Sequence, residues 1–171
     1  MLGRYHATRT TMRIATLRLY SVYGPWEDPH RLIPSVIVRG LGGAWPPLVA
    51  PDVARNFVYV DDVVDAFVEA AASAKTGSVY NVGTGAQTTL QQVVDLASRA
   101  LPITAKPHWN TMQPHAWDTS TWVADPAAIA VDLRWRPRHT FEQGFCRFIE
   151  WFRSQTDRLE VYRVHMLPSV H

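Results

Sequence analysis

The chain has 171 residues, of which 47% are hydrophobic and 19% are charged, and its formal net charge is +2. These proportions are ordinary for a globular protein, and a compact chain of this length buries roughly 70% of the surface that its unfolded form exposes. They predict one domain or one large subdomain. They argue against a membrane-spanning protein, because no apolar run approaches the ~20 residues that cross a bilayer.

The positive charge comes almost entirely from arginine, since Lys75 and Lys106 are the only lysines. The arginines are scattered, apart from one small cluster at Arg134, Arg136 and Arg138. A nucleic-acid-binding protein concentrates its basic residues in a stripe, so we expect no nucleic-acid partner. Arginine does suit diphosphate groups, because its planar guanidinium can bond two oxygens at once.

A single cysteine, Cys146, cannot form an internal disulfide, and no second cysteine supports a metal or redox motif. Its neighbours Phe145 and Phe148 predict a buried helix position rather than a reactive thiol. Residues 1–6 lack the apolar segment of a signal peptide, so a cytoplasmic location is expected.

The first part of the chain predicts a strand between two helical segments. Residues 2–10 read as the end of a helix, and Ala15–Leu19 is an apolar run of strand length. After a proline-containing loop, a helix is predicted to start near Leu32 with Pro34 in its first turn. Gly42 and the glycine after it are expected to end that helix.

The next segment predicts a strand that leads directly into a helix. Phe57–Val60 is rich in β-branched and aromatic residues, as strands are. Asp61 and Asp62 are then expected to cap a helix over residues 63–73, with Phe67 among its core-facing residues.

A further strand at Ser78–Val82 precedes the second long helix. Thr88, with Gln91 three residues later, has the form of a capping box that opens a helix running to Leu101. Trp122–Ala124 is predicted as a short strand.

The last helix is predicted from the residue pair Thr140 and Gln143, which repeats the capping-box pattern, to about Arg153. Four phenylalanines recur on one side of it, at positions 141, 145, 148 and 152. The tail from Asp157 to His171 shows no clear period, so we expect it to be ordered only against a partner.

Strands that alternate with helices indicate an α/β fold. About two strands could join a parallel sheet, and the short ones would form a separate small unit. Parallel strands are normally covered and flanked on both sides, so Ala15–Leu19 without further neighbours would be an exposed edge.

Four sequence blocks carry a resemblance to a known family. They are, in order, LRLYSVYGP at 17–25, RNFVYVDDVV at 55–64, YNVGTG at 80–85, and DTSTWVAD at 118–125, followed by LRW at 133–135. In this order and spacing the chain resembles the C-terminal part of extended short-chain dehydrogenase/reductases, the NAD-dependent nucleotide-sugar epimerases and 4,6-dehydratases. The resemblance implies the C-terminal part of an extended Rossmann-type fold: the last sheet strands plus a small mixed α/β substrate-binding subdomain.

The same resemblance implies which residues meet the ligands. Tyr20 and Ser21 would lie near the cofactor or the hexose, with Ser21 where many relatives carry asparagine. Arg31 and Leu32 would approach the nucleotide diphosphate at a helix N-terminus, which supplies free N–H groups and partial positive charge. Arg55 would engage the same diphosphate.

Two further positions are expected to contact the nucleotide. Asp118 resembles the carboxylate that accepts hydrogen bonds from the ribose. The family pattern has an arginine three residues earlier, where this chain has His115. A neutral histidine would attract phosphate less strongly. Asn56 stands where an aspartate is more usual.

Other motifs are set aside. Gly83-Thr84-Gly85 lacks the third glycine of a dinucleotide fingerprint and reads as a turn. Asp61, Asp62 and Asp65 read as capping and solvated helix surface instead of a metal site. The histidines do not show metal-ligand spacing, and no metal is expected. Most of the seven tryptophans are interpreted as core residues.

Two parts of the family machinery are missing from these 171 residues. There is no glycine-rich turn of the kind that holds the NAD pyrophosphate, and no Tyr-x-x-x-Lys pair for proton transfer. The nearest pattern, Tyr5 with Arg9, lies too close to the strand at 15–19. We therefore expect no catalytic residue in this chain, and NAD binding by this chain alone is not expected.

Three interpretations follow. The favoured one is a UDP-glucose 4-epimerase-like protein that appears as a C-terminal fragment, from a truncated gene or a misplaced start codon, and is inactive alone. The second is a non-catalytic nucleotide-sugar binding module. The third is a half-enzyme that docks on a separately encoded NAD-binding chain and buries the edge at 15–19. A homodimer is a further possible assembly.

In domain terms, residues 1–153 would be the substrate-binding half and 154–171 a tail. The sequence leaves open which nucleotide and sugar are bound, and whether the reaction is epimerisation or dehydration.

Overall fold

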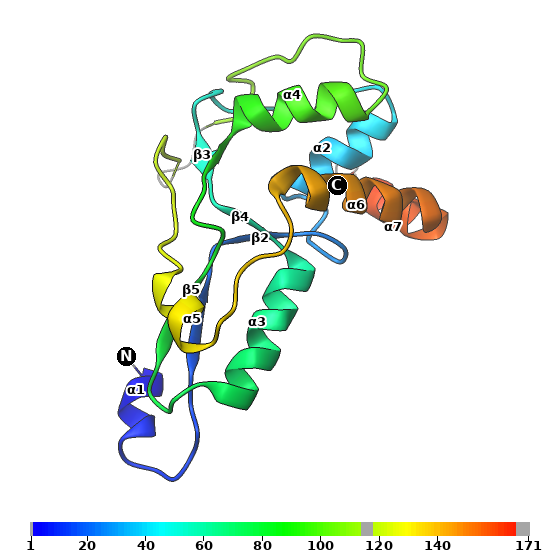
Figure 1. The fold of residues 1–171 in the computed structure, drawn as a ribbon. Helices are drawn as coiled ribbons and strands as arrows, with labels where there is room; N and C mark the ends of the chain where they lie inside the picture. The colour runs from blue at the N-terminus through cyan, green and yellow to red at the C-terminus, as the bar shows by residue number, and fades with distance from the viewer. Residues whose placement is uncertain (1, 114–117, 167–171) are drawn as a thin grey trace. The chain divides into compact units, whose positions relative to one another are not determined.

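The computed structural model describes residues 2–113 and 118–166. Within them it contains seven helices and six short strands (Figure 1). In chain order they are α1 (Leu2–Ala7), β1 (Thr16–Leu19), β2 (Ser21–Tyr23), α2 (Leu32–Leu41), β3 (Ala54–Arg55), β4 (Phe57–Tyr59), α3 (Val60–Ser73), β5 (Val79–Val82), β6 (Thr88–Thr89), α4 (Leu90–Ala100), α5 (Ala127–Asp132), α6 (Phe141–Ser154) and α7 (Thr156–His165). This alternation confirms the predicted α/β class.

The strands pair in twos: β1 with β5, β2 with β4, and β3 with β6. The β1–β5 pair is parallel, as expected, with Thr16 opposite Val79 and Leu19 opposite Val82. Among the described residues β1 has no second neighbour, and three of its four residues are exposed. The expected open edge is therefore present.

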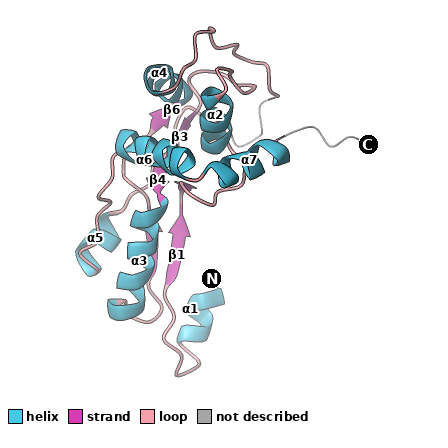
Figure 2. Cartoon of the chain, turned by 90° about the vertical axis from the view of Figure 1, so that its right-hand side faces the viewer, coloured by secondary structure: helices cyan, strands magenta, loops and turns pink. Residues whose placement is uncertain are grey.

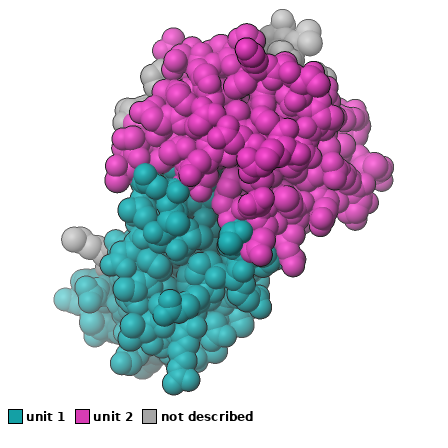
Figure 3. All heavy atoms as spheres, turned by 45° about the horizontal axis from the view of Figure 1, so that its top comes forward, with its two compact units in different colours: residues 1–22, 55–87, 122–140 teal, residues 23–54, 88–121, 141–171 magenta. Residues whose placement is uncertain are grey.

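The chain divides into two compact units, coloured separately in Figure 3. Unit 1 comprises residues 1–22, 55–87 and 122–140, and unit 2 comprises residues 23–54, 88–121 and 141–171. Each unit is thus assembled from three separate stretches of sequence.

The core of unit 1 lies between α3 and the β1–β5 pair, along which α3 runs (Figure 2). Val63, Ala66 and Ala70 from α3 are buried with Tyr80 and Val82 from β5. Phe67, predicted to face the core, is instead 51% exposed. The helix begins at Val60, three residues earlier than predicted, and Ala66 takes the core-facing position that was assigned to Phe67.

Asp62 does not have its predicted role. The N-cap of α3 is Tyr59, without a side-chain cap, and Asp62 is 1% exposed inside the first turn. Its carboxylate accepts the backbone N–H groups of Arg138 and His139, each at 3.1 Å, and contacts His139 Nδ1 at 2.9 Å. Its backbone carbonyl accepts Trp135 Nε1–H at 3.0 Å. Instead of forming solvated helix surface, Asp62 anchors the segment after α5.

Unit 2 is a helical layer around α2, which contacts α4, α6 and α7. The predicted phenylalanine stripe on α6 is confirmed, since Phe145, Phe148 and Phe152 are fully buried. Each such ring contributes roughly 1.5–3 kcal/mol by burial. Cys146 is half-buried on the same helix, where burial, Glu142 and Glu150 raise its thiol pKa.

The tail was expected to be ordered only against a partner, but Thr156–His165 forms helix α7 within this chain. The Tyr162 side chain of this helix is buried and packs edge-on against Phe152, with ring centroids 4.9 Å apart. Sequence periodicity missed this helix because only one residue anchors it, so no apolar stripe repeats along it.

Two local predictions need correction. The capping box of α4 uses Thr89 and Gln92, one residue later than predicted. Residues 122–124 form no strand, although Ala124 is buried. Within the described part of the chain, no helix is both long and apolar enough to cross a membrane.

Replacing Asp62 tests this anchor. In Asp62→Asn one carboxylate oxygen becomes an NH₂ group that faces backbone N–H donors, so we expect unfolding free energy to fall by about 2–4 kcal/mol. Asp61→Asn is the matched control, because Asp61 lies in the same helical turn but is exposed. Its loss should be within about 1 kcal/mol. Urea unfolding of both variants measures the difference, and equal losses would contradict the anchoring role.

Candidate functional site

The predicted site residues fall into the two units. Tyr20, Ser21 and Arg55 belong to unit 1, and Arg31, Leu32 and Asp118 to unit 2. His115 lies outside the described residues.

In unit 1, one tryptophan brings Tyr20 and Arg55 together. Tyr20 follows β1 directly, and its backbone N–H donates to Val82 O on β5 at 3.2 Å. Its ring meets the Trp122 ring edge to face, with centroids 6.5 Å apart. The Arg55 guanidinium carbon lies 5.6 Å from the centroid of the same indole. A cation over an aromatic face is held by the ring quadrupole, so Trp122 orients the Arg55 side chain.

Trp122 was not among the predicted site residues, because it was assigned to a short strand. It is 39% exposed, and its backbone N–H donates to Gln87 Oε1 at 3.1 Å, so the residue is fixed while its ring remains accessible. The available signal was its position: a large aromatic directly after the polar run 118–121. We define Tyr20, Trp122 and Arg55 as the Trp122 cluster.

The buried residue Asn56 fixes the backbone next to this cluster. Its backbone carbonyl accepts the Ser21 N–H at 3.0 Å, which holds the residue after Tyr20. Its side-chain Nδ2 donates to Ala86 O at 2.6 Å, and its Oδ1 accepts the Thr84 N–H at 2.9 Å. The side chain must therefore donate and accept at once, which an amide can do and a carboxylate cannot.

The turn after β5 was interpreted as structural, and its packing supports that view. A Cβ on Gly83 would lie 2.5 Å from Asn56 Oδ1 and 2.6 Å from Ala124 Cβ, so protein atoms already fill the space beside it. Gly85 has φ +76°, a left-handed conformation that glycine adopts without strain. Because the Thr84 N–H is also taken by Asn56, this turn does not fit the NAD pyrophosphate.

In unit 2, Arg31 is the N-cap of α2, and its side chain is 58% exposed. The first turn of α2 carries no acidic residue, so the partial positive charge of the helix N-terminus is not neutralised there. Leu32 is half-buried against the cluster of Val49, Val53 and Leu90, which fixes the start of the helix. The two predicted residues are therefore adjacent, one exposed and one anchored.

Arg31 has an acidic partner that the sequence did not predict. Its Nε lies 2.9 Å from Glu27 Oε1, and the Glu27 side chain is only 10% exposed. Burial raises the pKa of Glu27 to about 8, although the Arg31 charge and hydrogen bond act to lower it. Glu27 is therefore largely neutral at pH 7.

Asp118 is half-buried in the segment that precedes unit 1's Trp122 in sequence. The next residue holds this segment, because Thr119 O accepts the Ala54 N–H at 2.8 Å. The residue predicted to contact the ribose thus lies beside a backbone hydrogen bond within unit 2.

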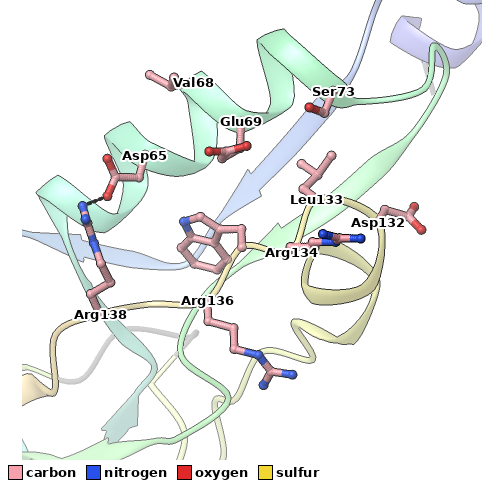
Figure 4. A pocket seen from close by; sticks show the side chains of 10 residues that line it. Asp65, Val68, Glu69, Ser73, Asp132, Leu133, Arg134, Arg136 and Arg138 are labelled. Carbon is pink, nitrogen blue, oxygen red and sulfur yellow. Dashed lines mark hydrogen bonds and ion pairs between the residues drawn. The ribbon is translucent and has the colours of Figure 1, made fainter.

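A pocket of about 620 Å³ lies elsewhere, between α3 and residues 132–138 of unit 1 (Figure 4). Three arginines and three carboxylates line it: Arg134, Arg136, Arg138, Asp65, Glu69 and Asp132. Val68, Ser73, Leu133 and Trp135 complete the lining. Arg138 pairs with Asp65, and Figure 4 shows Arg136 turned away from α3. With its charges balanced, this pocket has no excess attraction for phosphate, and no predicted site residue lies in it.

No group of three or more His, Cys, Asp or Glu side chains that could hold a metal ion occurs in residues 2–113 and 118–166.

The chain is similar to known proteins of one family. The model of the NAD dependent epimerase/dehydratase family matches residues 1–83. A UDP-glucose 4-epimerase of Mycolicibacterium smegmatis is 30% identical over 140 residues, which cover 80% of this chain and 44% of that protein. A dTDP-glucose 4,6-dehydratase of Escherichia coli is 28% identical over 145 residues, covering 81% and 40%.

Among solved structures, the UDP-glucose 4-epimerase of Thermotoga maritima with UDP-glucose superposes with a TM-score of 0.79 at 27% identity. The match covers 89% of this chain and 50% of that one. The chain spans 44% and 40% of the two curated relatives. These matches confirm the resemblance and the fold inferred from the four sequence blocks.

Changing Asn56 tests the hydrogen bonds that its side-chain amide makes beside the Trp122 cluster. Asn56→Asp replaces the Nδ2 donor with an oxygen that faces Ala86 O, so we expect a loss of about 1–3 kcal/mol in unfolding free energy. Asn81→Asp is the control, because Asn81 Nδ2 also donates to a backbone carbonyl, Asp125 O, but at an exposed position. Thermal unfolding at pH 7 should show a clearly lower Tm for Asn56→Asp alone. A Tm equal to that of the wild type would contradict the role of the amide.

Proposed function

Because the chain belongs to the NAD-dependent epimerase/dehydratase family of extended short-chain dehydrogenase/reductases, we propose that it binds the nucleoside diphosphate of a nucleotide-sugar. The observation that carries this proposal is the Trp122 cluster, in which an arginine and two aromatic rings are held together at an accessible place.

Arg55 is the proposed diphosphate residue of unit 1. It is half-buried at the end of β3, and its guanidinium is oriented by Trp122, so little side-chain freedom remains to be lost on binding. A guanidinium forms strong charge-assisted hydrogen bonds to phosphate oxygens. Tyr20 and Trp122 offer a ring face and a hydroxyl beside it, which suit the apolar and polar sides of a hexose.

Unit 2, taken by itself, also carries residues whose chemistry suits parts of such a ligand. Arg31 and the backbone N–H groups of Leu32 and Ile33 in the first turn of α2 suit an anion, whereas Pro34 offers no N–H. The Asp118 carboxylate suits the hydroxyls of a ribose. UDP- and dTDP-linked sugars are both candidates, because they are what the epimerase and dehydratase relatives are named for.

The family implies NAD, whose hydride chemistry would oxidise the sugar transiently at C4. The turn after β5 does not fit the pyrophosphate of that cofactor, and the 171 residues hold no Tyr-x-x-x-Lys pair, so no catalytic step is assigned to them. We propose that the chain binds without turnover by itself, in the cytoplasm. The division into a substrate-binding half at 1–153 and a tail at 154–171 likewise stays a proposal.

Titration calorimetry with UDP-glucose and with dTDP-glucose at pH 7 tests this proposal. We expect one site on the wild type. Arg55→Met should weaken Kd about 10- to 100-fold, because it removes charge-assisted bonds worth about 1.5–3 kcal/mol. Trp122→Ala should weaken Kd about 5- to 30-fold through lost stacking and a freed Arg55.

Arg136→Ala is the matched control, because it removes an arginine from the other pocket. Its Kd should stay within about twofold of the wild type, as expected for a residue outside the site. Weaker binding in Arg136→Ala with unchanged binding in Arg55→Met would move the ligand to that pocket. The absence of heat for both sugars at millimolar concentration would refute the proposal.

A second candidate function is that of a half-enzyme whose β1 edge docks on an NAD-binding chain. A specific observation favours it: a groove of about 220 Å³ beside β1 is lined mostly by apolar residues, including Leu17, Phe67 and Ala71. Helix α3, which carries Phe67 and Ala71, also exposes Val64 and Val68, at 55% and 61%. An open parallel-strand edge next to an apolar helix face is what a further strand and its crossover would cover.

Mixing the chain with a separately expressed NAD-binding half of a family relative tests this second function. We expect a one-to-one complex by light scattering and NAD-dependent turnover of the sugar. Phe67→Glu should abolish the complex, because it places a charge in the groove. Val131→Glu should not, since Val131 is 78% exposed on α5 and does not line the groove. A mass of two identical chains, or no complex, would contradict docking of that half.

A further inference from the structure

The loop between β2 and α2 is held in an unusual conformation. Trp26 has φ +73°, a left-handed backbone conformation that is a genuine outlier for so bulky a residue. Its ring is 67% exposed, so burial of the indole does not explain the conformation. The contacts around the loop must maintain it.

Those contacts come from α6 and α7. The Arg158 guanidinium carbon lies 4.6 Å above the Trp26 ring, and Trp151 meets that ring edge to face at 5.6 Å. The next residue is tied as well, because the Tyr162 hydroxyl donates to Glu27 O at 2.7 Å. The helix that the sequence did not predict therefore fixes the backbone of Glu27.

The fixed backbone places the Glu27 carboxyl beside Arg31, four residues later. Oε1 lies 2.9 Å from Arg31 Nε, whereas Oε2 is buried and has no hydrogen-bond partner among the described residues. A buried carboxylate with only one oxygen satisfied is costly. The arrangement thus holds Arg31 but tolerates the negative charge poorly.

Few other charges act on this carboxyl. Arg31 and Asp28 are the charged groups on its own loop, and Tyr162 faces it from α7. On α6, the uncharged ring of Trp151 contacts Trp26 in this loop. The pKa of Tyr162 is itself raised by burial and by Glu27, so its hydroxyl stays protonated and keeps its hydrogen bond. Burial outweighs the Arg31 charge and raises the Glu27 pKa to about 8.

We propose that Glu27 is a positioning residue for Arg31: its carboxyl holds the guanidinium at the start of α2 and is neutral when a diphosphate binds there. The proposal rests on the proposed function, since it requires the diphosphate to meet Arg31. When Glu27 is charged it competes with the diphosphate for the same cation, and when it is protonated Arg31 is held in place but electrostatically available.

The pH dependence follows in sign and size. Glu27 is mostly neutral below pH 8, so diphosphate affinity should be highest there. Above pH 8 the free protein loses this proton, and binding must take it up again. Between pH 7 and pH 9 the neutral fraction falls about tenfold, so the affinity should fall by up to about tenfold.

The experiment is titration calorimetry of UDP-glucose at pH 7 and pH 9 with the wild type, Glu27→Gln and Tyr162→Phe. We expect the wild type to weaken about tenfold at pH 9 and Glu27→Gln to bind equally at both values, because glutamine keeps the shape without the charge. Tyr162→Phe removes the loop anchor but not the titrating group. It should weaken binding at both pH values by a similar factor and retain the pH dependence.

Proton uptake gives a second readout. At pH 9 the wild-type binding heat should differ between buffers of different ionisation enthalpy, by about one proton per ligand, and Glu27→Gln should show less. Titration of the ligand base affects all variants alike and cancels in the comparison. If the wild type binds at pH 7 but shows the same pH dependence as Glu27→Gln, the positioning role is overturned and the proposed function stands. If no variant binds at pH 7, both are overturned.

Discussion

The double hydrogen bond of the buried Asn56 amide is the interaction on which unit 1 depends. Its backbone carbonyl holds Ser21 after β1, and its side chain holds both ends of the turn after β5, at Thr84 and Ala86. Tyr20 and Arg55 are the neighbours in sequence of two of these fixed points. The side chain at this position must both donate and accept a hydrogen bond. Asn56, which stands where an aspartate is more usual, therefore serves packing rather than ligand chemistry.

Two buried carboxyls show how surroundings decide the role of a side chain. Asp62 is 1% exposed, but both of its oxygens accept hydrogen bonds, so it stabilises the segment after α5. The Glu27 side chain is 10% exposed, one of its oxygens has no hydrogen-bond partner among the described residues, and burial raises its pKa to about 8. The first is a structural anchor, whereas the second contacts the exposed cation of Arg31 through one oxygen.

The family assignment and the site geometry bear on different questions. The matches to UDP-glucose 4-epimerases and dTDP-glucose 4,6-dehydratases establish the family, over 40–44% of the relatives' length. The Trp122 cluster in unit 1 and the start of α2 in unit 2 are the observations behind our proposal of nucleoside-diphosphate binding. Neither assigns a reaction to it.

The sequence by itself determined the family, the α/β class, the β1–β5 strands and the candidate residues Arg31 and Arg55, because these depend on local patterns and on short ordered motifs. Tertiary structure decided the rest. Trp122 joins Tyr20 to Arg55 across about a hundred residues of sequence, Asp62 is buried by a segment more than seventy residues away, and Glu27 is held by α7 from the far end of the chain. Periodicity and spacing report what neighbours in sequence do, whereas burial and pKa depend on neighbours in space, which only the folded chain supplies.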